Sequence, residues 1–273
     1  MKSKKLGGNS MDERTKNLNM FYNDKCDEDL RLTSKHGSIE FITTTKYIDK
    51  LLKNGDRILE IGAGTGKYSL YYANKGYKVN AIEFVNNNLE VLKSKITDDM
   101  DIVAEQGDAL DLSRFDDNTF DVTLVLGPLY HLYDKKDIDK AINEAIRVTK
   151  KEGIIAIAYL TSDSIMVNWG LMGNHLIDGY PNDYDDNFKM INYPGGIFAA
   201  FYIKEFKDMM SNYNVEYLNN IATDGLAHHL KEKIDSLSDE EFNIWLNYHL
   251  STCEREDLQG YSNHMLYICK KRI

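Results

Sequence analysis

The stretch ILEIGAGTGKYSLYYANKGYKVNAIEF, residues 58 to 84, narrows the possible folds of this chain most strongly. An apolar run ends in a carboxylate, three glycines follow closely, and a second apolar run again ends in a carboxylate. Short apolar runs on either side of a helical segment indicate two buried strands joined by a helix. Glycines after the first strand let the backbone turn sharply and approach a ligand. The stretch therefore predicts a β-α-β unit with a ligand at the carboxyl ends of its strands.

The same alternation of strands and helices continues along the chain. The core strands are expected at 57–61, 78–83, 102–106, 120–126 and 153–160, with helices between them at 66–75, 87–96 and 137–150. The flanking elements are expected as helices at 11–26, 38–53, 203–211 and 239–253, and as strands at 214–222 and 264–271. Strands that alternate with helices over short connections are typical of an α/β fold with a parallel sheet.

The segment 161–200 has a different composition, in which Gly, Asn, Asp and Pro are mixed with aromatic residues and methionine. We interpret it as an ordered lid over a site rather than as a linker. The predicted organisation has four parts, which are an N-terminal tail and cap helix at 1–37, a ligand-binding core at 38–160, a lid or substrate insertion at 161–202 and the C-terminal part of the same core at 203–273.

Charge and apolar patterning exclude several classes of partner. The chain carries 33 basic and 43 acidic residues, a net charge of -10, which disfavours binding to a phosphate backbone. The longest apolar run, 154–160, is far shorter than the roughly 20 residues that span a bilayer. Three scattered cysteines form no metal-ligand pattern, and residues 1–10 have no secretory signal. We expect a cytoplasmic protein without nucleic-acid, membrane or metal partners.

Acidic residues at the strand ends indicate the chemistry of the ligand. Glu60 lies two residues before a GxGxG loop, where a carboxylate repels a pyrophosphate but suits an ammonium or sulfonium group. Glu83 ends the second strand, where a carboxylate accepts hydrogen bonds from ribose hydroxyls. Asp108 follows the third strand and faces a purine edge in this interpretation. Each carboxylate alone could cap a helix or a turn, but their order along the chain points to one ligand.

The segments LEIGAGTG, NAIEF, QGDALDL and TFDVTLVLGPLYHL resemble successive motifs of class I S-adenosylmethionine-dependent methyltransferases, over about residues 40 to 160. GPLYHL is similar to a motif of a bacterial methyltransferase-11-like group. The resemblance implies a Rossmann-like α/β fold with a mostly parallel sheet of seven strands, the last of them antiparallel, and helices on both faces. It also implies S-adenosyl-L-methionine as the cofactor of the 38–160 core.

The resemblance further implies where the cofactor binds. Glu60 would contact the methionine amino group, Glu83 the ribose hydroxyls and Asp108 the adenine edge. The implied cofactor-binding residues are Glu60, Gly62, Ala63, Gly64, Gly66, Glu83, Phe84, Val85, Gly107, Asp108, Ala109, Leu126 and Gly127.

Methyl transfer from a sulfonium is an in-line displacement, in which alignment of the reactants accounts for about 7 to 11 kcal/mol of the barrier. A base is needed only when the acceptor must lose a proton. His131 and Tyr130, which follow the fourth strand in GPLYHL, are the predicted catalytic residues. A catalytic His131 is expected to titrate near the usual imidazole pKa. In the alternative interpretation, His131 bonds only backbone and Tyr130 only walls the cavity.

These features favour an S-adenosylmethionine-dependent methyltransferase that acts on a small-molecule acceptor at O, N or S, as a monomer or a homodimer. One alternative is a non-catalytic S-adenosylmethionine-binding regulator. Another is a nicotinamide-dependent oxidoreductase, against which Glu60 and the GxGxG spacing count. The acceptor and its methylated atom stay open at this point.

Overall fold

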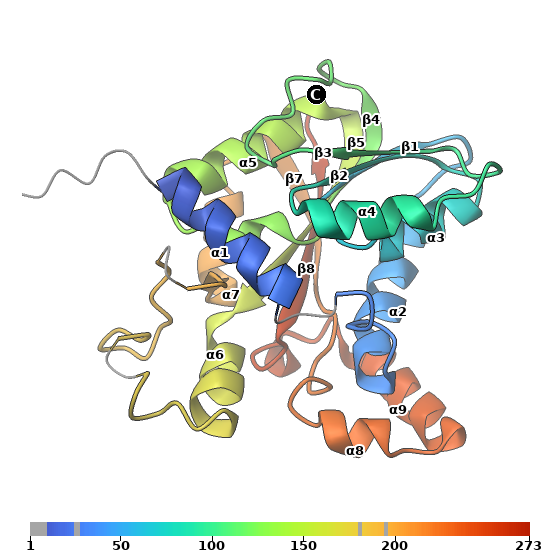
Figure 1. Ribbon diagram of the computed structural model, residues 1–273. Helices are drawn as coiled ribbons and strands as arrows, with labels where there is room; N and C mark the ends of the chain where they lie inside the picture. The colour runs from blue at the N-terminus through green and yellow to red at the C-terminus, as the bar shows by residue number, and fades with distance from the viewer. Residues whose placement is uncertain (1–9, 25–27, 180–181, 194–195) are drawn as a thin grey trace, which may run out of the picture.

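The computed structural model describes residues 10–24, 28–179, 182–193 and 196–273 of the chain. Nearly all of the predicted tail at 1–10 lies outside these residues. One central sheet runs through the described part of the molecule (Figure 1). Its strands are β1 (Arg57–Ile61), β2 (Lys78–Glu83), β3 (Ile102–Gln106), β4 (Phe120–Val125), β5 (Thr149–Thr161), β6 (Ala200–Phe201), β7 (Val215–Ala222) and β8 (His264–Lys271).

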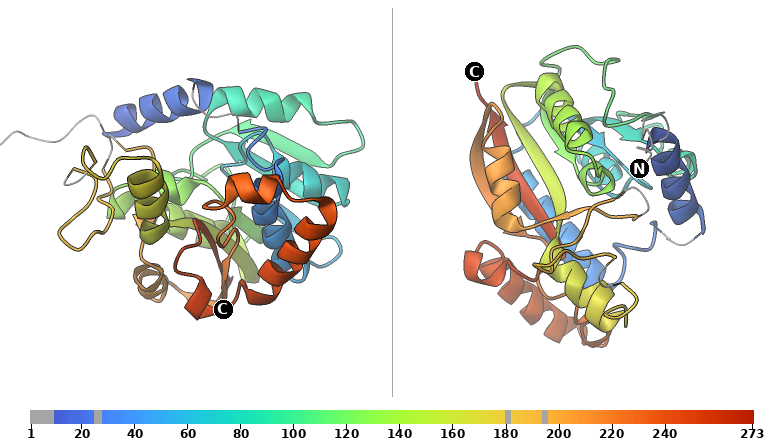
Figure 2. Two further views of the ribbon diagram at one scale, coloured as in Figure 1. Left: turned by 90° about the horizontal axis from the view of Figure 1, so that it is seen from below. Right: turned by 90° about the vertical axis from the view of Figure 1, so that its left-hand side faces the viewer.

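The strand order is β3-β2-β1-β4-β5-β8-β7, and β6 pairs with β5 outside this path. The pairs β1–β2, β2–β3, β1–β4 and β4–β5 are parallel, whereas β8 runs antiparallel to both β5 and β7. Helices lie on both faces of the sheet (Figures 1 and 2). The Rossmann-like fold predicted from the sequence is therefore confirmed, with the two-residue β6 as an additional strand.

Helices precede and connect these strands. They are α1 (Ser10–Asp24), α2 (Lys35–Asp49), α3 (Lys67–Asn74), α4 (Asn86–Ser94), α5 (Lys135–Val148), α6 (Ser162–Ile165), α7 (Ile203–Met210), α8 (Lys231–Asp235) and α9 (Asp239–Thr252). Tighter 3-10 turns form at Pro128–His131 and Glu256–Leu258, and a π-helix forms at Met166–Met172. No helix in the described part of the chain is long and apolar enough to cross a lipid bilayer.

The boundary between α5 and β5 differs from the sequence prediction. The helix ends at Val148, and β5 already begins at Thr149 instead of residue 153. Thr149 is fully buried, where its hydroxyl bonds Thr123 on β4 at 2.7 Å and Thr149 pairs with Phe120. A β-branched residue that is buried between two strands favours the extended conformation. The polar residues after Thr149 interrupt the apolar pattern, so the sequence did not indicate the early start of the strand.

Parallel pairing places the carboxyl ends of β1, β2, β3 and β4 at one edge of the sheet. Ile61 pairs with Ile82 on β2 and with Val125 on β4, so the three strands end at the same level. Ligands of open α/β sheets bind at this edge. The loop after β1 and the turn Pro128–His131 after β4 both start there.

The insertion between β5 and α7 packs its last part against that edge. The backbone amide of Ala199 donates a hydrogen bond to the carbonyl of Tyr130 at 2.7 Å. The ring centre of Phe198 lies 5.4 Å from those of His131 and Phe21. The insertion and α1 therefore meet beside the turn after β4.

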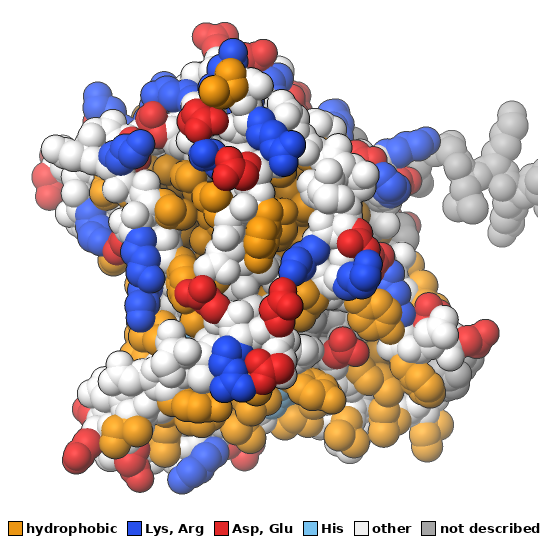
Figure 3. Space-filling model, turned by 180° about the vertical axis from the view of Figure 1, so that it is seen from behind, with side chains coloured by type: hydrophobic (Ala, Val, Ile, Leu, Met, Phe, Trp, Pro, Cys, Tyr) orange, Lys and Arg blue, Asp and Glu red, His pale blue; other side chains and the backbone are white. Residues whose placement is uncertain are grey.

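The surface in Figure 3 shows acidic and basic side chains interspersed, with hydrophobic side chains gathered along the lower edge. Exposed hydrophobic residues occur on α9 and on the insertion, for example Ile244 at 66% and Ile177 at 93% exposure. This face carries no stripe of one charge.

Gly66 has a packing role that predicts a loss of stability on substitution. It precedes α3 with φ +90°, and an added Cβ would lie 2.1 Å from Leu92 Cδ1. Gly76 has a similar φ of +86° but has no atom within 4 Å of an added Cβ. We expect Gly76→Ala to cost about 1 to 2 kcal/mol of unfolding free energy because of its backbone conformation. Gly66→Ala should cost about 1 to 3 kcal/mol more because of overpacking.

Urea denaturation of the two variants, under identical conditions, measures this difference. The Gly76 variant is the matched control, since it carries the same backbone penalty without the clash. Equal losses in the two variants would contradict the packing role of Gly66.

Candidate active site

The glycine loop after β1 is tied to the end of β2 by hydrogen bonds. The amides of Gly62 and Ala63 both donate to the carbonyl of Ile82, at 2.7 and 3.0 Å. The amide of Gly64 donates to the Glu83 carboxylate at 2.7 Å. Gly62 and Gly64 have φ of +77° and +55°, which side chains rarely adopt. The loop therefore depends both on its glycines and on Glu83.

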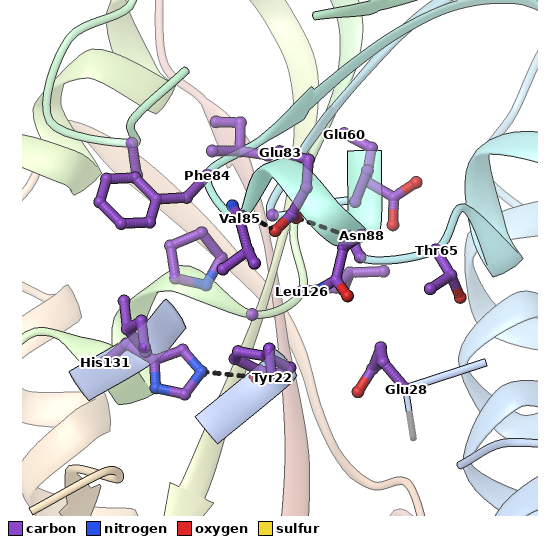
Figure 4. A pocket seen from close by; sticks show the side chains of 18 of the residues that line it. Tyr22, Glu28, Glu60, Thr65, Glu83, Phe84, Val85, Asn88, Leu126 and His131 are labelled. Carbon is purple, nitrogen blue, oxygen red and sulfur yellow. Dashed lines mark hydrogen bonds between the residues drawn. The ribbon is translucent and has the colours of Figure 1, made fainter. Parts of the chain in front are cut away.

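Glu83 is a structural acceptor as well as a site residue. Its second carboxylate oxygen accepts the Val85 amide at 2.8 Å, and Asn88 bonds the same carboxylate (Figure 4). The residue is only 5% exposed. Burial raises the pKa of Glu83, while the two backbone hydrogen bonds and Asn88 oppose that shift.

Glu60 at the end of β1 is buried more completely, at 1% exposure. The Ser69 hydroxyl donates a hydrogen bond to its carboxyl group. Burial raises the pKa of Glu60 to about 8, against the effect of Ser69. Its carboxyl therefore holds a proton at neutral pH in this conformation, and a cation beside it would favour ionisation.

Asp108 and Phe84 follow β3 and β2 and face α1. One Asp108 oxygen accepts the Leu110 amide at 3.0 Å, and the other forms an ion pair with Arg14. The guanidinium carbon of Arg14 lies 4.9 Å from the centre of the Phe84 ring. The end of the site that these residues form is thus covered by α1.

His131 is buried between α1 and the insertion. Its Nδ1 lies 2.8 Å from the carbonyl oxygen of Ile197, which can only accept, so Nδ1 carries the proton. Its Nε2 lies 2.8 Å from the Tyr22 hydroxyl, which is therefore the donor to Nε2 (Figure 4). Burial lowers the pKa of His131 to about 4. The sequence-based expectation of an ordinary imidazole pKa does not hold in this environment.

Tyr130 points back to the fourth strand. Its hydroxyl donates to the carbonyl of Leu126 at 2.9 Å, and its ring centre lies 4.9 Å from that of His131. An added Cβ on Gly127 would lie 3.6 Å from the Tyr130 hydroxyl. These contacts make Tyr130 part of the wall between the strand end and His131.

One cavity of about 90 Å³ brings most of the predicted residues together. Its predicted lining residues are Glu60, Gly62, Ala63, Gly64, Glu83, Phe84, Val85, Gly107, Asp108, Ala109, Leu126, Gly127, Tyr130 and His131. Gly66 does not line it, because its α-carbon faces Leu92 beneath the loop. Its place in the cofactor site stays a prediction beside the packing role described above.

Sequence reasoning did not select the other lining residues. They are Arg14, Leu18, Tyr22, Glu28, Arg31, Leu32, Ile61, Thr65, Lys67, Tyr68, Asn88, Pro128 and Leu132. Arg14, Leu18 and Tyr22 recur every four residues, which places them on one face of α1. This spacing was the only sequence signal that α1 faces the cavity. It was weak, because two of the three residues are polar and a buried face is normally apolar.

A buried ionic network lies behind Tyr130. Glu40, Asp224 and His264 are spaced so that they could hold a metal ion. His264 Nδ1 lies 2.9 Å from Asp224 and 3.4 Å from Glu40, and Arg31 binds Glu40 at 2.7 Å. Burial alone would lower the pKa of His264, but the two carboxylates raise it. Arg31 and His264 thus already contact these carboxylates.

Comparison with known proteins gives the core its family. A family model described as a methyltransferase domain matches residues 59–157. YqeM of Bacillus subtilis, a protein classed among the methyltransferases, is 31% identical over 111 residues, which are 41% of this chain and 45% of YqeM. Demethylmenaquinone methyltransferase of Paenarthrobacter aurescens is 33% identical over 130 residues, 48% of this chain and 49% of that protein. The chain thus matches about half the length of these curated relatives.

Solved structures extend the similarity to most of the fold. An S-adenosylmethionine-dependent methyltransferase from Methanosarcina mazei superposes with a TM-score of 0.55 and 19% identity, covering 83% of this chain and 97% of that one. Residues 59–157 thus match a methyltransferase domain, and the chain shares the fold of this solved methyltransferase. S-adenosyl-L-methionine is the cofactor that this methyltransferase domain implies.

The buried Glu60 predicts a pH dependence of stability in this methyltransferase domain. Its pKa is about 8 in the folded state and near 4.5 when unfolded. Between these values only the folded state keeps the proton, so the free energy of unfolding falls as pH rises. The fall is up to about 1.4 kcal/mol per pH unit. Glu60→Gln should remove this contribution, because the amide does not titrate.

Denaturation of the wild type and Glu60→Gln across this pH range measures the difference in slope. Other groups titrate equally in both proteins, so only the difference reports Glu60. Parallel stability curves would show that Glu60 is not protonated by burial.

Proposed function

We propose that this protein is an S-adenosylmethionine-dependent methyltransferase that acts on a small-molecule acceptor. The observation that carries the proposal is one cavity lined by the carboxyl groups at the ends of β1, β2 and β3 together with the glycine loop. These three groups suit the three polar parts of the cofactor, namely its ammonium, its ribose diol and its adenine amine.

The buried carboxyl of Glu60 fits a cationic ligand. A carboxyl with a pKa near 8 loses its proton readily when a positive charge arrives, since the charge offsets the cost of burial. We assign Glu60 to the amino group of the methionine part. Gly62, Ala63 and Gly64 lie beside it and bring backbone, without long side chains, to the same part of the ligand.

The other predicted residues divide between ribose, adenine and the sulfonium side. Glu83 is assigned to the ribose hydroxyls, because its oxygens retain lone pairs beside the backbone amides that they bind. Phe84, Val85 and Ala109 provide apolar contact with adenine, and Asp108 with the adjacent Gly107 accepts its amine. Leu126 and Gly127 line the methionine side.

When bound, the cofactor supplies a methyl group on a sulfonium. The chain holds the acceptor in line with it and excludes water. Tyr22 on α1, His131 after β4 and the end of the insertion at Ile197 surround the acceptor side in this assignment. Enclosure by these three segments favours a small molecule over a polymer as the acceptor. In this proposal the 161–202 insertion and α1 cover the acceptor site.

Tyr22 and His131 provide a path for the acceptor proton. The hydroxyl of Tyr22 donates to Nε2 of His131, so a proton lost to His131 can be replaced from the acceptor side. The neutral imidazole with a pKa near 4 is a weak base. It can take the proton of a hydroxyl acceptor during methyl transfer, when the developing bond makes that hydroxyl strongly acidic, whereas a methylated ammonium keeps its proton.

Donor binding should depend on the Glu83 carboxylate. We expect Glu83→Gln to weaken S-adenosylhomocysteine by about tenfold or more, because hydrogen bonds to a charged acceptor contribute about 1.5 to 3 kcal/mol. Isothermal titration calorimetry measures the affinity. NADH, titrated in parallel, should not bind, which separates the proposal from the oxidoreductase alternative.

Because Glu83 also anchors the glycine loop, a ligand-side control is needed. Removal of the ribose 2′-hydroxyl from the ligand should weaken binding to the wild type but make little difference to the Glu83 variant. If both proteins lose the same affinity when the hydroxyl is removed, Glu83 does not bind the ribose. Unchanged affinity of the variant for the intact ligand would contradict the donor site itself.

The role of His131 predicts a second kinetic result. With a hydroxyl acceptor, identified by release of S-adenosylhomocysteine from a compound panel, His131→Ala should lower turnover by about 10² to 10⁴-fold. Tyr22→Phe should also lower it, with donor affinity little changed in both. With a neutral amine or thiolate acceptor, the loss should be smaller and appear mainly in the acceptor KM.

The pH profile distinguishes a base from a wall residue. A base with a pKa near 4 is lost as pH falls through that value, so the wild type should show an acid limb there that both variants lack. Full activity of both variants at every pH would exclude this role. Donor binding with no turnover on any acceptor would favour the non-catalytic alternative.

A further inference from the structure

Arg14 lies on the face of α1 that closes the cavity. Arg14, Leu18 and Tyr22 recur every four residues and all line the cavity. Arg14 is 6% and Leu18 is 5% exposed, so this end of the helix is not merely resting on the surface. Tyr22, about 12 Å farther along the helix axis, reaches His131 at the acceptor side (Figure 4).

The contacts of Arg14 involve two residues that the proposed function assigns to adenine. Its guanidinium forms an ion pair with Asp108 and covers the Phe84 ring at 4.9 Å. An adenine would use the same carboxylate oxygen for its amine and the same ring for its face. The Arg14 guanidinium and the adenine are both planar, and both donate N–H. They therefore cannot occupy this position together.

The buried side chain of Arg14 also leaves one of its hydrogen-bond donors unused among the described residues. Its Nε is buried and has no hydrogen-bond partner among the described residues. An unmade hydrogen bond of a buried charged group costs free energy. The Arg14 side chain can therefore gain a hydrogen bond, to solvent or to another partner, when it leaves Asp108.

The small volume of the cavity also indicates that side chains must move before the cofactor binds. Sites for cofactor-sized ligands have volumes of about 300 to 1,000 Å³. The cavity has about 90 Å³ in this conformation. A ligand of that size therefore enters only if lining side chains move, and those of α1 cover the end at Asp108.

We propose that Arg14 competes with the adenine of the cofactor for Asp108 and Phe84. This inference rests on the proposed function, since it takes the adenine position from it. The cofactor binds after the Arg14 side chain leaves Asp108, so the fraction of molecules with this contact broken sets its apparent affinity.

The test compares two substitutions on the same helix. Arg14→Met removes the charge but keeps an apolar side chain of similar length. Lys16→Met removes a charge from an exposed position of α1 and is the matched control. We expect Arg14→Met to bind S-adenosylhomocysteine about threefold to tenfold more tightly than the wild type by calorimetry, and Lys16→Met to bind as the wild type does.

A double-mutant cycle assigns the effect to Asp108. In an Asp108→Asn background, where the ion pair is already lost, Arg14→Met should change the affinity by a smaller factor. A gain of the same size in both backgrounds would contradict competition for this carboxylate. Circular dichroism and thermal unfolding of each variant show whether the fold is intact.

Weaker binding by Arg14→Met would overturn the inference, because it would mean that Arg14 holds the adenine instead of displacing it. Equal binding would overturn it as well. If neither the wild type nor any variant binds S-adenosylhomocysteine, the proposed function fails, which is a different result from a binding protein whose affinity ignores Arg14.

Discussion

The tie between the glycine loop and the end of β2 is the interaction on which the site depends. Three consecutive amides, from Gly62 to Gly64, donate to the Ile82 carbonyl and the Glu83 carboxylate. The loop is thereby held across two strand ends, while Gly62 packs against Pro128 from the turn after β4. This arrangement keeps Glu60 beneath the loop and Glu83 beside it. The Glu83 carboxylate therefore both holds the loop and faces into the cavity. A substitution that removes this carboxylate affects both roles at once.

Much of the sheet was predictable because its signals are local. β1, β2, β3 and β8 lie at the predicted residues, since apolar runs bounded by turn residues specify buried strands. The packing of Gly66 against Leu92 was not predictable, because spacing alone does not tell whether a glycine accommodates a ligand or a neighbouring side chain. The low pKa of His131 arises from segments far apart in sequence, α1 and the insertion, and the pairing of Arg14 with Asp108 does so too. Only the folded chain brings such partners together.

The family match covers only part of the acceptor side, since it includes His131 but not the residues that flank it. The methyltransferase domain match ends at residue 157, and Tyr22 and Ile197, which flank His131, lie outside it. A fold of this kind fixes the place of a ligand but not the chemistry done beside it. Motifs, relatives and geometry therefore all indicate the cofactor site. The acceptor half has support from geometry alone, and the contacts of His131 are its centre.

The position of β8 has a consequence for the order in which this protein folds. β8 lies between β5 and β7 in the sheet but follows both in the chain. During synthesis, β5 and β7 therefore emerge with open edges that only residues 264–271 can fill. Exposed strand edges promote association between incomplete chains, and pairing between distant segments is slow. The sheet of the nascent chain accordingly stays unfinished until β8 has been made, and this is the period in which a chaperone would protect it most.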